Sequence, residues 1–196
     1  MLENEFDKEL LSSSLLGVRT LKELYEKEKN ITNVKMIMLN IEPIEGELDY
    51  RHLKEIHYFL FKEVYSWAGK DRYEANIGAK FGKGKTLFTP YEKLPMVSTL
   101  LFNALKDETY FKYQDKETFT KSASSFMNGL NILHPFREGN GRVQRIFMQY
   151  LATNAGYSLN FRNITYEEMR MASIKGANGN LVLMQRVFSK ALEEGA

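Results

Sequence analysis

The stretch 134–145 constrains the fold of this chain more than any other, because it joins a helix end, a glycine-rich loop and a helix start. It reads His-Pro-Phe-Arg-Glu-Gly-Asn-Gly-Arg-Val-Gln-Arg. The apolar spacing of residues 115–133 predicts a helix, and Pro135 ends it because proline disfavours helical backbone in the residue before it. Residues 140–155 predict a second helix, which Gly156 ends. The stretch is therefore expected to run as a loop into the N-terminus of a helix.

The loop has the composition of a phosphate-binding site. The first turn of a helix carries backbone N–H groups without intrahelical partners, and it is the positive end of the helix dipole. Gly139 and Gly141 have no side chain to keep a phosphate away from that backbone, and the side-chain amide of Asn140 can donate a hydrogen bond. Residues 139–141 are therefore expected to bind phosphate.

Four other side chains of the stretch add chemistry to that site. Arg142 and Arg145 lie three positions apart and share a helix face, so they could hold a polyphosphate. Glu138 is placed to hold an Mg²⁺ ion that bridges phosphates. His134 can accept a proton from an attacking hydroxyl, and the combination predicts transfer of a nucleotide phosphate group. The plainer alternative is that the His-Pro-Phe run only ends a helix and that the arginines form a solvated face.

The stretch resembles the signature of Fic-domain proteins, His-x-Phe-x-Glu/Asp-Gly-Asn-Gly-Arg-x-x-Arg, and every defined position is filled. The resemblance covers about residues 30–193. It implies an all-α Fic fold, a single helical domain over residues 1–196 with one small β-hairpin flap. Residues 1–29 are expected to form an N-terminal helix ahead of the family region. Phe136 is expected to pack and fix the loop rather than to react.

A second run, Lys-Gly-Lys-Thr-Leu-Phe from Lys83 onward, resembles the flap hairpin that lies over the active site in the family. Residues 75–77 and 86–89 are the strands expected around its turn. On this resemblance Lys83 and Gly84 are expected among the nucleotide-binding residues, although Lys83 also fits a solvated hairpin tip. An exposed hairpin edge can pair with an extended segment of another protein, so a target protein is expected to dock at the flap.

The resemblance implies the usual chemistry of the family, which is transfer of AMP from ATP to a Tyr, Thr or Ser hydroxyl of a target protein. On that basis His134 is the base, Glu138 holds Mg²⁺ against the α- and β-phosphates, and residues 139–141 receive the developing phosphate charge. Arg142 and Arg145 are expected to orient the β- and γ-phosphates. ATP and Mg²⁺ are the expected cofactors.

Gly141 favours AMP transfer over the alternatives that the fold leaves open. A relative that phosphorylates a translation factor carries lysine at the matching position and binds its nucleotide the other way round, whereas glycine leaves room for the AMP-transferring orientation. A phosphotransferase of the same fold is one alternative. A binding module that has lost catalysis is another, and the intact His134 and Glu138 argue against it.

The resemblance also implies that the activity is restrained, as it is in bacterial toxins. In many Fic proteins a helix with the pattern Ser/Thr-x-x-x-Glu-Gly/Asn supplies a glutamate that pairs with the second signature arginine, here Arg145. This chain has Ser189 and Glu193 at that spacing, but Glu194 stands where glycine or asparagine is expected. The broken pattern favours restraint by a separate small antitoxin, with self-inhibition through the C-terminal helix as the alternative.

Composition excludes several other classes of protein. The net charge of +2, from 27 basic and 25 acidic residues, argues against a sequence-independent nucleic-acid binder. The absence of cysteine excludes a disulfide framework and a thiolate zinc site. No apolar run is long enough to span a membrane, and the acidic N-terminus lacks the pattern of a signal peptide. A cytoplasmic location is expected, and export by a dedicated secretion system stays open.

Apolar periodicity and capping residues predict the remaining elements. His52 and His57 fall on a helix expected over residues 48–67, and their spacing is not that of a helical metal pair, so they are expected to be structural or surface residues. Thr165 to Glu168 reads as a capping box. The other expected elements are a helix over 4–29, a connection over 30–47, a helix from Pro90 to Leu105 and a last helix over 181–194.

Overall fold

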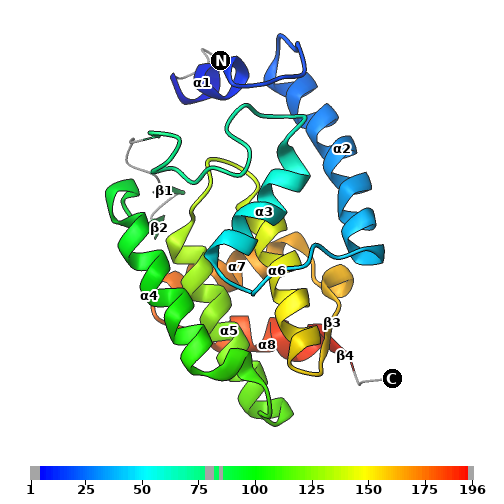
Figure 1. Ribbon diagram of the computed structural model, residues 1–196, viewed down its shortest axis with the longest axis vertical. Coiled ribbons are helices and arrows are strands. Elements are labelled where there is room, and N and C mark those ends of the chain that lie inside the picture. The colour runs from blue at the N-terminus through cyan, green and yellow to red at the C-terminus, as the bar shows by residue number, and fades with distance from the viewer. Residues whose placement is uncertain (1–4, 78–81, 84–85, 194–196) are drawn as a thin grey trace.

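Figure 1 shows a molecule built mainly of helices. The computed structural model describes residues 5–77, 82–83 and 86–193. The α-helices of this part of the chain are α1 (Glu5–Ser12), α2 (Leu21–Ile41), α3 (Tyr50–Phe61), α4 (Leu94–Asp107), α5 (Lys116–Leu133), α6 (Asn140–Asn154), α7 (Tyr166–Ala177) and α8 (Val182–Ala191). The shorter elements are the strands β1 (Gly82–Lys83), β2 (Thr86–Leu87), β3 (Ser158–Leu159) and β4 (Leu192–Glu193) and the 3-10 helices η1 (Tyr91–Lys93), η2 (Thr109–Phe111) and η3 (Phe161–Asn163). The predicted all-α fold with a small β-hairpin is confirmed.

Helices α5 and α6 lie at the centre of the molecule (Figure 1). Helix α5 packs against α4, α6, α7 and α8, and α6 packs against both α3 and α5. Helix α2 packs against α3 on the outside. The buried face of α5 follows the apolar spacing that predicted this helix, and it includes Phe119, Ala123, Phe126, Met127 and Leu130. Because the loop 134–139 joins α5 to α6, both of its ends are anchored in the core.

Capping residues fix where the central helices begin and end. Asp115 accepts hydrogen bonds from two backbone N–H groups in the first turn of α5, at 2.9 and 3.0 Å. Gly156 follows α6 with a φ of 85°. The capping box of Thr165 and Glu168 is present at the start of α7. The stop at Gly156 and the capping box at Thr165 were both predicted from the sequence.

The single helix expected over residues 4–29 is wrong, because the chain breaks between α1 and α2. Gly17 adopts a φ of 61° in that break, and Thr20 begins α2 as its N-cap. Helix α2 then continues through the region expected to be a connection. Its residues Leu24 and Leu39, near the two ends, are both buried in the core. Burial of one face over the whole length therefore outweighs the polar residues that suggested a connection.

Helix α3 ends earlier than expected, at Phe61. The turns that follow it bury Tyr65 and Trp67 in the core. A turn also occupies residues 72–76, so the strand expected over 75–77 is not formed. The predicted hairpin is nevertheless formed, since β1 and β2 pair in antiparallel register.

Two further boundaries differ from the expectation. Helix α4 begins at Leu94 after η1, because Pro95 rather than Pro90 takes the first-turn position. The last helix ends at Ala191, after which β4 pairs with β3 as a second small sheet that was not predicted. Across the described ranges, no helix is both long and apolar enough to cross a membrane.

Candidate active site

One buried arginine, Arg72, holds the loop between α5 and α6 from outside. Its Nε donates to the carbonyl of His134 at 2.9 Å, and its Nη2 donates to the carbonyls of Thr89 and Leu133 at 2.7 and 3.3 Å. Its backbone N–H donates to the carbonyl of Pro135 at 2.8 Å. These bonds fix the left-handed turn of His134, with φ of 44° and ψ of 58°, at the end of α5. Sequence reasoning missed Arg72, because its partners lie 17 and 61–62 positions away in the chain.

Asn140 closes the same loop from within. The backbone N–H of Phe136 donates to Asn140 Oδ1 at 2.9 Å, and Asn140 Nδ2 donates to the carbonyl of Phe136 at 2.7 Å. Both residues are buried, so Phe136 is the packing anchor that was predicted. The Asn140 amide is bonded to the loop in this structure, and its expected contact with the nucleotide stays a prediction.

His57 supports the loop from α3. Its Nδ1 accepts a hydrogen bond from the backbone N–H of Gly69 at 2.9 Å, so its Nε2 carries the proton and donates to the carbonyl of Glu138 at 3.2 Å. Its ring stacks on Phe136 with centroids 3.9 Å apart. Burial lowers the pKa of His57 to about 3, which keeps the ring neutral. His52 is also buried and bonds a backbone carbonyl at 2.9 Å, so both histidines are structural, the first of the two alternatives expected for them.

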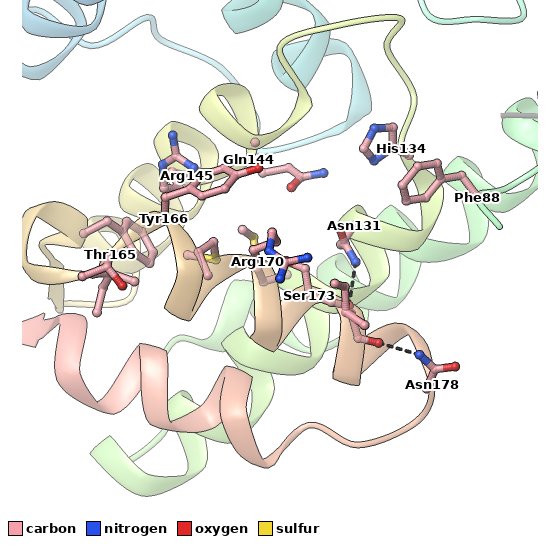
Figure 2. A pocket seen from close by; sticks show the side chains of 16 residues that line it. Phe88, Asn131, His134, Gln144, Arg145, Thr165, Tyr166, Arg170, Ser173 and Asn178 are labelled. Atoms are coloured by element: carbon pink, nitrogen blue, oxygen red, sulfur yellow. Dashed lines mark hydrogen bonds between the residues drawn. The ribbon is translucent and has the colours of Figure 1, made fainter. Parts of the chain in front are cut away.

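A cavity of about 770 Å³ lies between the start of α6 and α7 (Figure 2). His134, Gly141 and Arg145 line one side of it. Phe88 lies beside them, and its ring stacks on that of His134 with centroids 3.7 Å apart. The facing wall is formed mainly by the α7 residues Tyr166, Met169, Arg170, Ser173 and Ile174. The volume is within the range of about 300–1,000 Å³ that small-molecule sites occupy.

The two signature arginines have different surroundings. Arg145 lines the cavity, and no described residue forms an ion pair or hydrogen bond with its guanidinium. Its pKa is lowered by burial first and by the charge of Arg142 second. Arg142 forms an ion pair with Glu28 at 2.5 Å and donates to Thr32 Oγ1 at 3.0 Å. Although the two arginines share a helix, the structure brings Arg145 to the cavity and ties Arg142 to α2.

Glu138 and Gly139 form the last part of the loop. Gly139 precedes α6 with a φ of 84°, and its N–H donates to Glu138 Oε1 at 2.9 Å. The Glu138 side chain is 38% exposed. Among the described residues no group of three or more His, Cys, Asp or Glu could hold a metal ion. One accessible carboxylate nevertheless fits Mg²⁺, which proteins often hold with one or two carboxylates, substrate phosphates and water.

The hairpin residues are only partly placed. Lys83 lies in β1, and Gly84 lies outside the described residues. Strand β2 leads directly into Phe88, whose ring lies on His134, so the hairpin is next to the imidazole. The nucleotide contacts expected of Lys83 and Gly84 stay a prediction.

Known proteins resemble this chain along most of its length. It is 34% identical over 181 residues to the protein adenylyltransferase VbhT of Bartonella schoenbuchensis, which covers 92% of this chain and 37% of that protein. It is 31% identical over 179 residues to an Escherichia coli protein named "Probable protein adenylyltransferase Fic", which covers 91% of this chain and 86% of that one. The crystal structure of the N-terminal Fic domain of a VirB-translocated Bartonella quintana effector, with bound ADP, is similar at a TM-score of 0.83 and 27% identity, over 93% of this chain and 90% of that one.

The chain spans little more than a third of the length of the Bartonella schoenbuchensis relative and most of the length of the Escherichia coli one. Residues 47–152 match the model of the Fic/DOC family. That range contains α3, the hairpin, α5, the signature loop and most of α6. The chain therefore belongs to the Fic/DOC family.

Proposed function

We propose that this chain is a protein adenylyltransferase, which moves AMP from ATP to a Tyr, Thr or Ser hydroxyl of a target protein. The observation that carries the proposal is the cavity shared by His134, Gly141 and Arg145, since it joins a base, an open helix N-terminus and a guanidinium. Relatives at 34% and 31% identity carry the name protein adenylyltransferase. A solved Fic domain at 27% identity holds ADP, which supports nucleotide binding here.

His134 acts as the base in this proposal. The imidazole takes the proton of the target hydroxyl while the hydroxyl oxygen attacks the α-phosphorus of ATP. The bond between the α-phosphorus and the oxygen bridging to the β-phosphate breaks, and pyrophosphate leaves. The ring is held by its stacking on Phe88 and by the bond of Arg72 to the His134 carbonyl. Such restraint reduces the entropy lost on reaching the reactive geometry.

The phosphates are received by the start of α6 and by Arg145. Backbone N–H groups of residues 140 and 141 lie in the first turn, where they have no intrahelical partner. Arg145 adds a charge-assisted hydrogen bond to a phosphate oxygen. A Cβ on Gly141 would lie 3.4 Å from Arg145 Nη1, so glycine keeps the space beside the guanidinium open. The open space beside Arg145 supports the proposal that ATP binds in the orientation for AMP transfer.

Glu138 would hold Mg²⁺ together with phosphate oxygens. A bound ion would neutralise phosphate charge and so favour departure of pyrophosphate. The chain itself orients this residue, because Gly139 N donates to its carboxylate and His57 donates to its carbonyl. The support for Mg²⁺ is the hard oxygen ligand placed next to the phosphate-binding turn.

The α7 wall fits the nucleoside part of ATP. Tyr166, Met169 and Ile174 supply apolar surface, and Arg170 and Ser173 supply hydrogen-bond donors. Cavities of this character bind flat, partly polar ligands well. The mouth near Phe88 and the hairpin is where the target segment is proposed to dock.

Restraint by a separate small antitoxin is also proposed, with the chain acting in the cytoplasm as a bacterial toxin. The support is the engagement of Glu193, which accepts hydrogen bonds from Ser158 Oγ at 3.2 Å and Asn160 Nδ2 at 2.6 Å. A carboxylate held at the β3–β4 sheet is not positioned to pair with Arg145. Delivery by a secretion system is compatible with the proposal, since the Bartonella quintana relative is a translocated effector.

Labelled ATP and a cell lysate test the function. The parent chain is expected to label target proteins, and mass spectrometry of the labelled site is expected to show a gain of about 329 Da for AMP rather than about 80 Da for phosphate. The His134→Ala variant serves as the control for non-enzymatic labelling. A gain of phosphate alone would assign the chain to the phosphotransferase alternative.

A further inference from the structure

Glu28, on α2, is a buried carboxylate outside the residues that match the family model. It is 3% exposed, whereas the neighbouring charged residues of α2 are solvated. Arg142 Nη2 lies 2.5 Å from its Oε1, and the hydroxyl of Tyr65 donates to its Oε2. A carboxylate is retained in such a place only where it is paired and hydrogen-bonded, so both oxygens of Glu28 are committed to these partners.

Arg142 lies between two carboxylates. Its Nη2 is 2.5 Å from Glu28 Oε1 and 3.7 Å from Glu138 Oε1. Thr32 Oγ1 accepts from its Nη1 at 3.0 Å, and its guanidinium lies 4.8 Å from the ring centroid of Phe61. The shorter distance, together with the hydrogen bond to Thr32 of α2, shows that Glu28, not Glu138, is the main partner of the cation.

We propose that Glu28 is a positioning residue of the active site, which anchors and neutralises Arg142 and thereby keeps the Glu138 carboxylate available to a metal–nucleotide complex. The inference rests on the proposed function, because it assumes that Glu138 holds the metal. Glu28 itself touches neither metal nor nucleotide. Its effect on the metal site passes through Arg142.

The physical reason is competition for Glu138. Without a counter-charge on α2, the nearest anion to Arg142 is the Glu138 carboxylate. A guanidinium that pairs with a carboxylate lowers its charge density and occupies the oxygen that a metal would use. Glu28 removes this competitor by binding it more closely. Residues that orient a ligand group from behind affect metal affinity by roughly 10–100-fold in other proteins.

The test uses the whole chain and a fluorescent ATP analogue. The Kd of this analogue is measured in EDTA and in saturating Mg²⁺. The Kd in EDTA divided by the Kd in Mg²⁺ reports how strongly metal and nucleotide binding are coupled. The Glu138→Gln variant is the reference, because it gives the ratio that results when a metal ligand is lost. Glu28→Gln is expected to lower the ratio by about tenfold, while Glu26→Gln, an exposed glutamate of the same helix, is expected to keep the parent value. A Glu28→Gln ratio within about twofold of the parent overturns the inference, because a merely structural role lowers Tm without changing the coupling.

A double variant keeps the test decisive if Glu28→Gln does not fold. Glu28→Gln combined with Arg142→Gln removes the cation and its counter-charge together, so no unpaired charge is left in the interior. Its ratio is expected to return to within about twofold of the parent, because Glu138 then has no competitor. A ratio as low as that of Glu138→Gln overturns the inference. Failure of the proposed function is distinguishable, since a parent chain that binds Mg²⁺ and nucleotide but labels no target contradicts the transferase activity and leaves the binding ratio meaningful.

Discussion

The ring of Phe61 fills the space into which any side chain at Gly139 would project. A Cβ built on Gly139 would lie 2.3 Å from two carbons of that ring, and Gly139 has a φ of 84°. The same ring stacks on His57 and carries the Arg142 guanidinium on its face. One α3 side chain thus sets how closely the start of α6 approaches α3.

Gly139→Ala is therefore expected to destabilise the fold and to impair nucleotide binding. Gly156→Ala is the matched control, because Gly156 has a φ of 85° and nothing within 4 Å of its Cβ position. In the control, stability is lost only because alanine must adopt a left-handed backbone conformation, which costs about 1 kcal/mol. Gly139→Ala adds an overpacking cost of about 1–3 kcal/mol. Urea unfolding of both variants measures the difference, and equal losses of stability would show that Phe61 moves aside freely.

His134→Ala is expected to abolish AMP transfer while nucleotide affinity and Tm stay close to those of the parent. The imidazole supplies the base, and the phosphates bind to the backbone of α6 and to Arg145, which the variant retains. General-base catalysis contributes about 10²–10⁴-fold, so the rate should fall by at least that factor. Transfer is measured with labelled ATP, and binding with the fluorescent analogue. A variant that transfers AMP at a near-parent rate would remove His134 as the base.

The central helices and the signature loop were predictable because their signals are local. Caps such as Asp115, and glycines such as Gly156, lie within a few residues of the elements that they bound. The supports of the loop were not predictable, because their partners are distant in the chain. The bonds from Arg72 to His134, from His57 to Glu138 and from Arg142 to Glu28 join residues 62, 81 and 114 positions apart. Because Glu28 is distant in the chain from Arg142, the sequence predicted that both signature arginines contact the phosphates. The structure shows Arg142 paired with this buried carboxylate of α2.

Gly141→Lys is expected to impair AMP transfer, because the side chain would fill the space beside Arg145 and add a second cation there. Gly141→Ala is the control. Its Cβ would lie 3.4 Å from Arg145 Nη1, which is the mobile end of a long side chain, so this variant is expected to keep most of the activity. Transfer rates of the two variants are compared with labelled ATP. A lysine variant as active as the alanine variant would contradict the use of Gly141 to assign the reaction.

The neutral, buried His57 predicts a specific loss of stability in mild acid. Its folded pKa is about 3, because burial disfavours the charged ring, and its unfolded pKa is about 6.5. Between pH 6.5 and pH 3 the unfolded chain therefore binds a proton that the folded chain does not. The free energy of unfolding falls as the pH falls through this window. Between pH 7.5 and 5.5 this group should account for about 1.4 kcal/mol.

Urea unfolding of the parent and of His57→Gln at these two pH values measures the effect of His57. Carboxylates add a pH dependence of their own, which both proteins share. The variant is expected to lose less stability than the parent by about 1.4 kcal/mol. An identical pH dependence of the two proteins would show that His57 is accessible to protons in the folded state.

Glu193→Gly tests whether the restraint on activity lies within the chain. Glu193 is bonded to Ser158 and Asn160 at the β3–β4 sheet, so removing it should weaken that sheet and leave Arg145 unchanged. The purified variant is expected to transfer AMP within about threefold of the parent rate, because a contact that contributed 1.4 kcal/mol of inhibition would shift the rate about tenfold. Asn160→Ala is the matched control, since it disrupts the same sheet while keeping the carboxylate. A rise of about tenfold or more in Glu193→Gly, with no rise in Asn160→Ala, would establish self-inhibition and contradict a separate antitoxin.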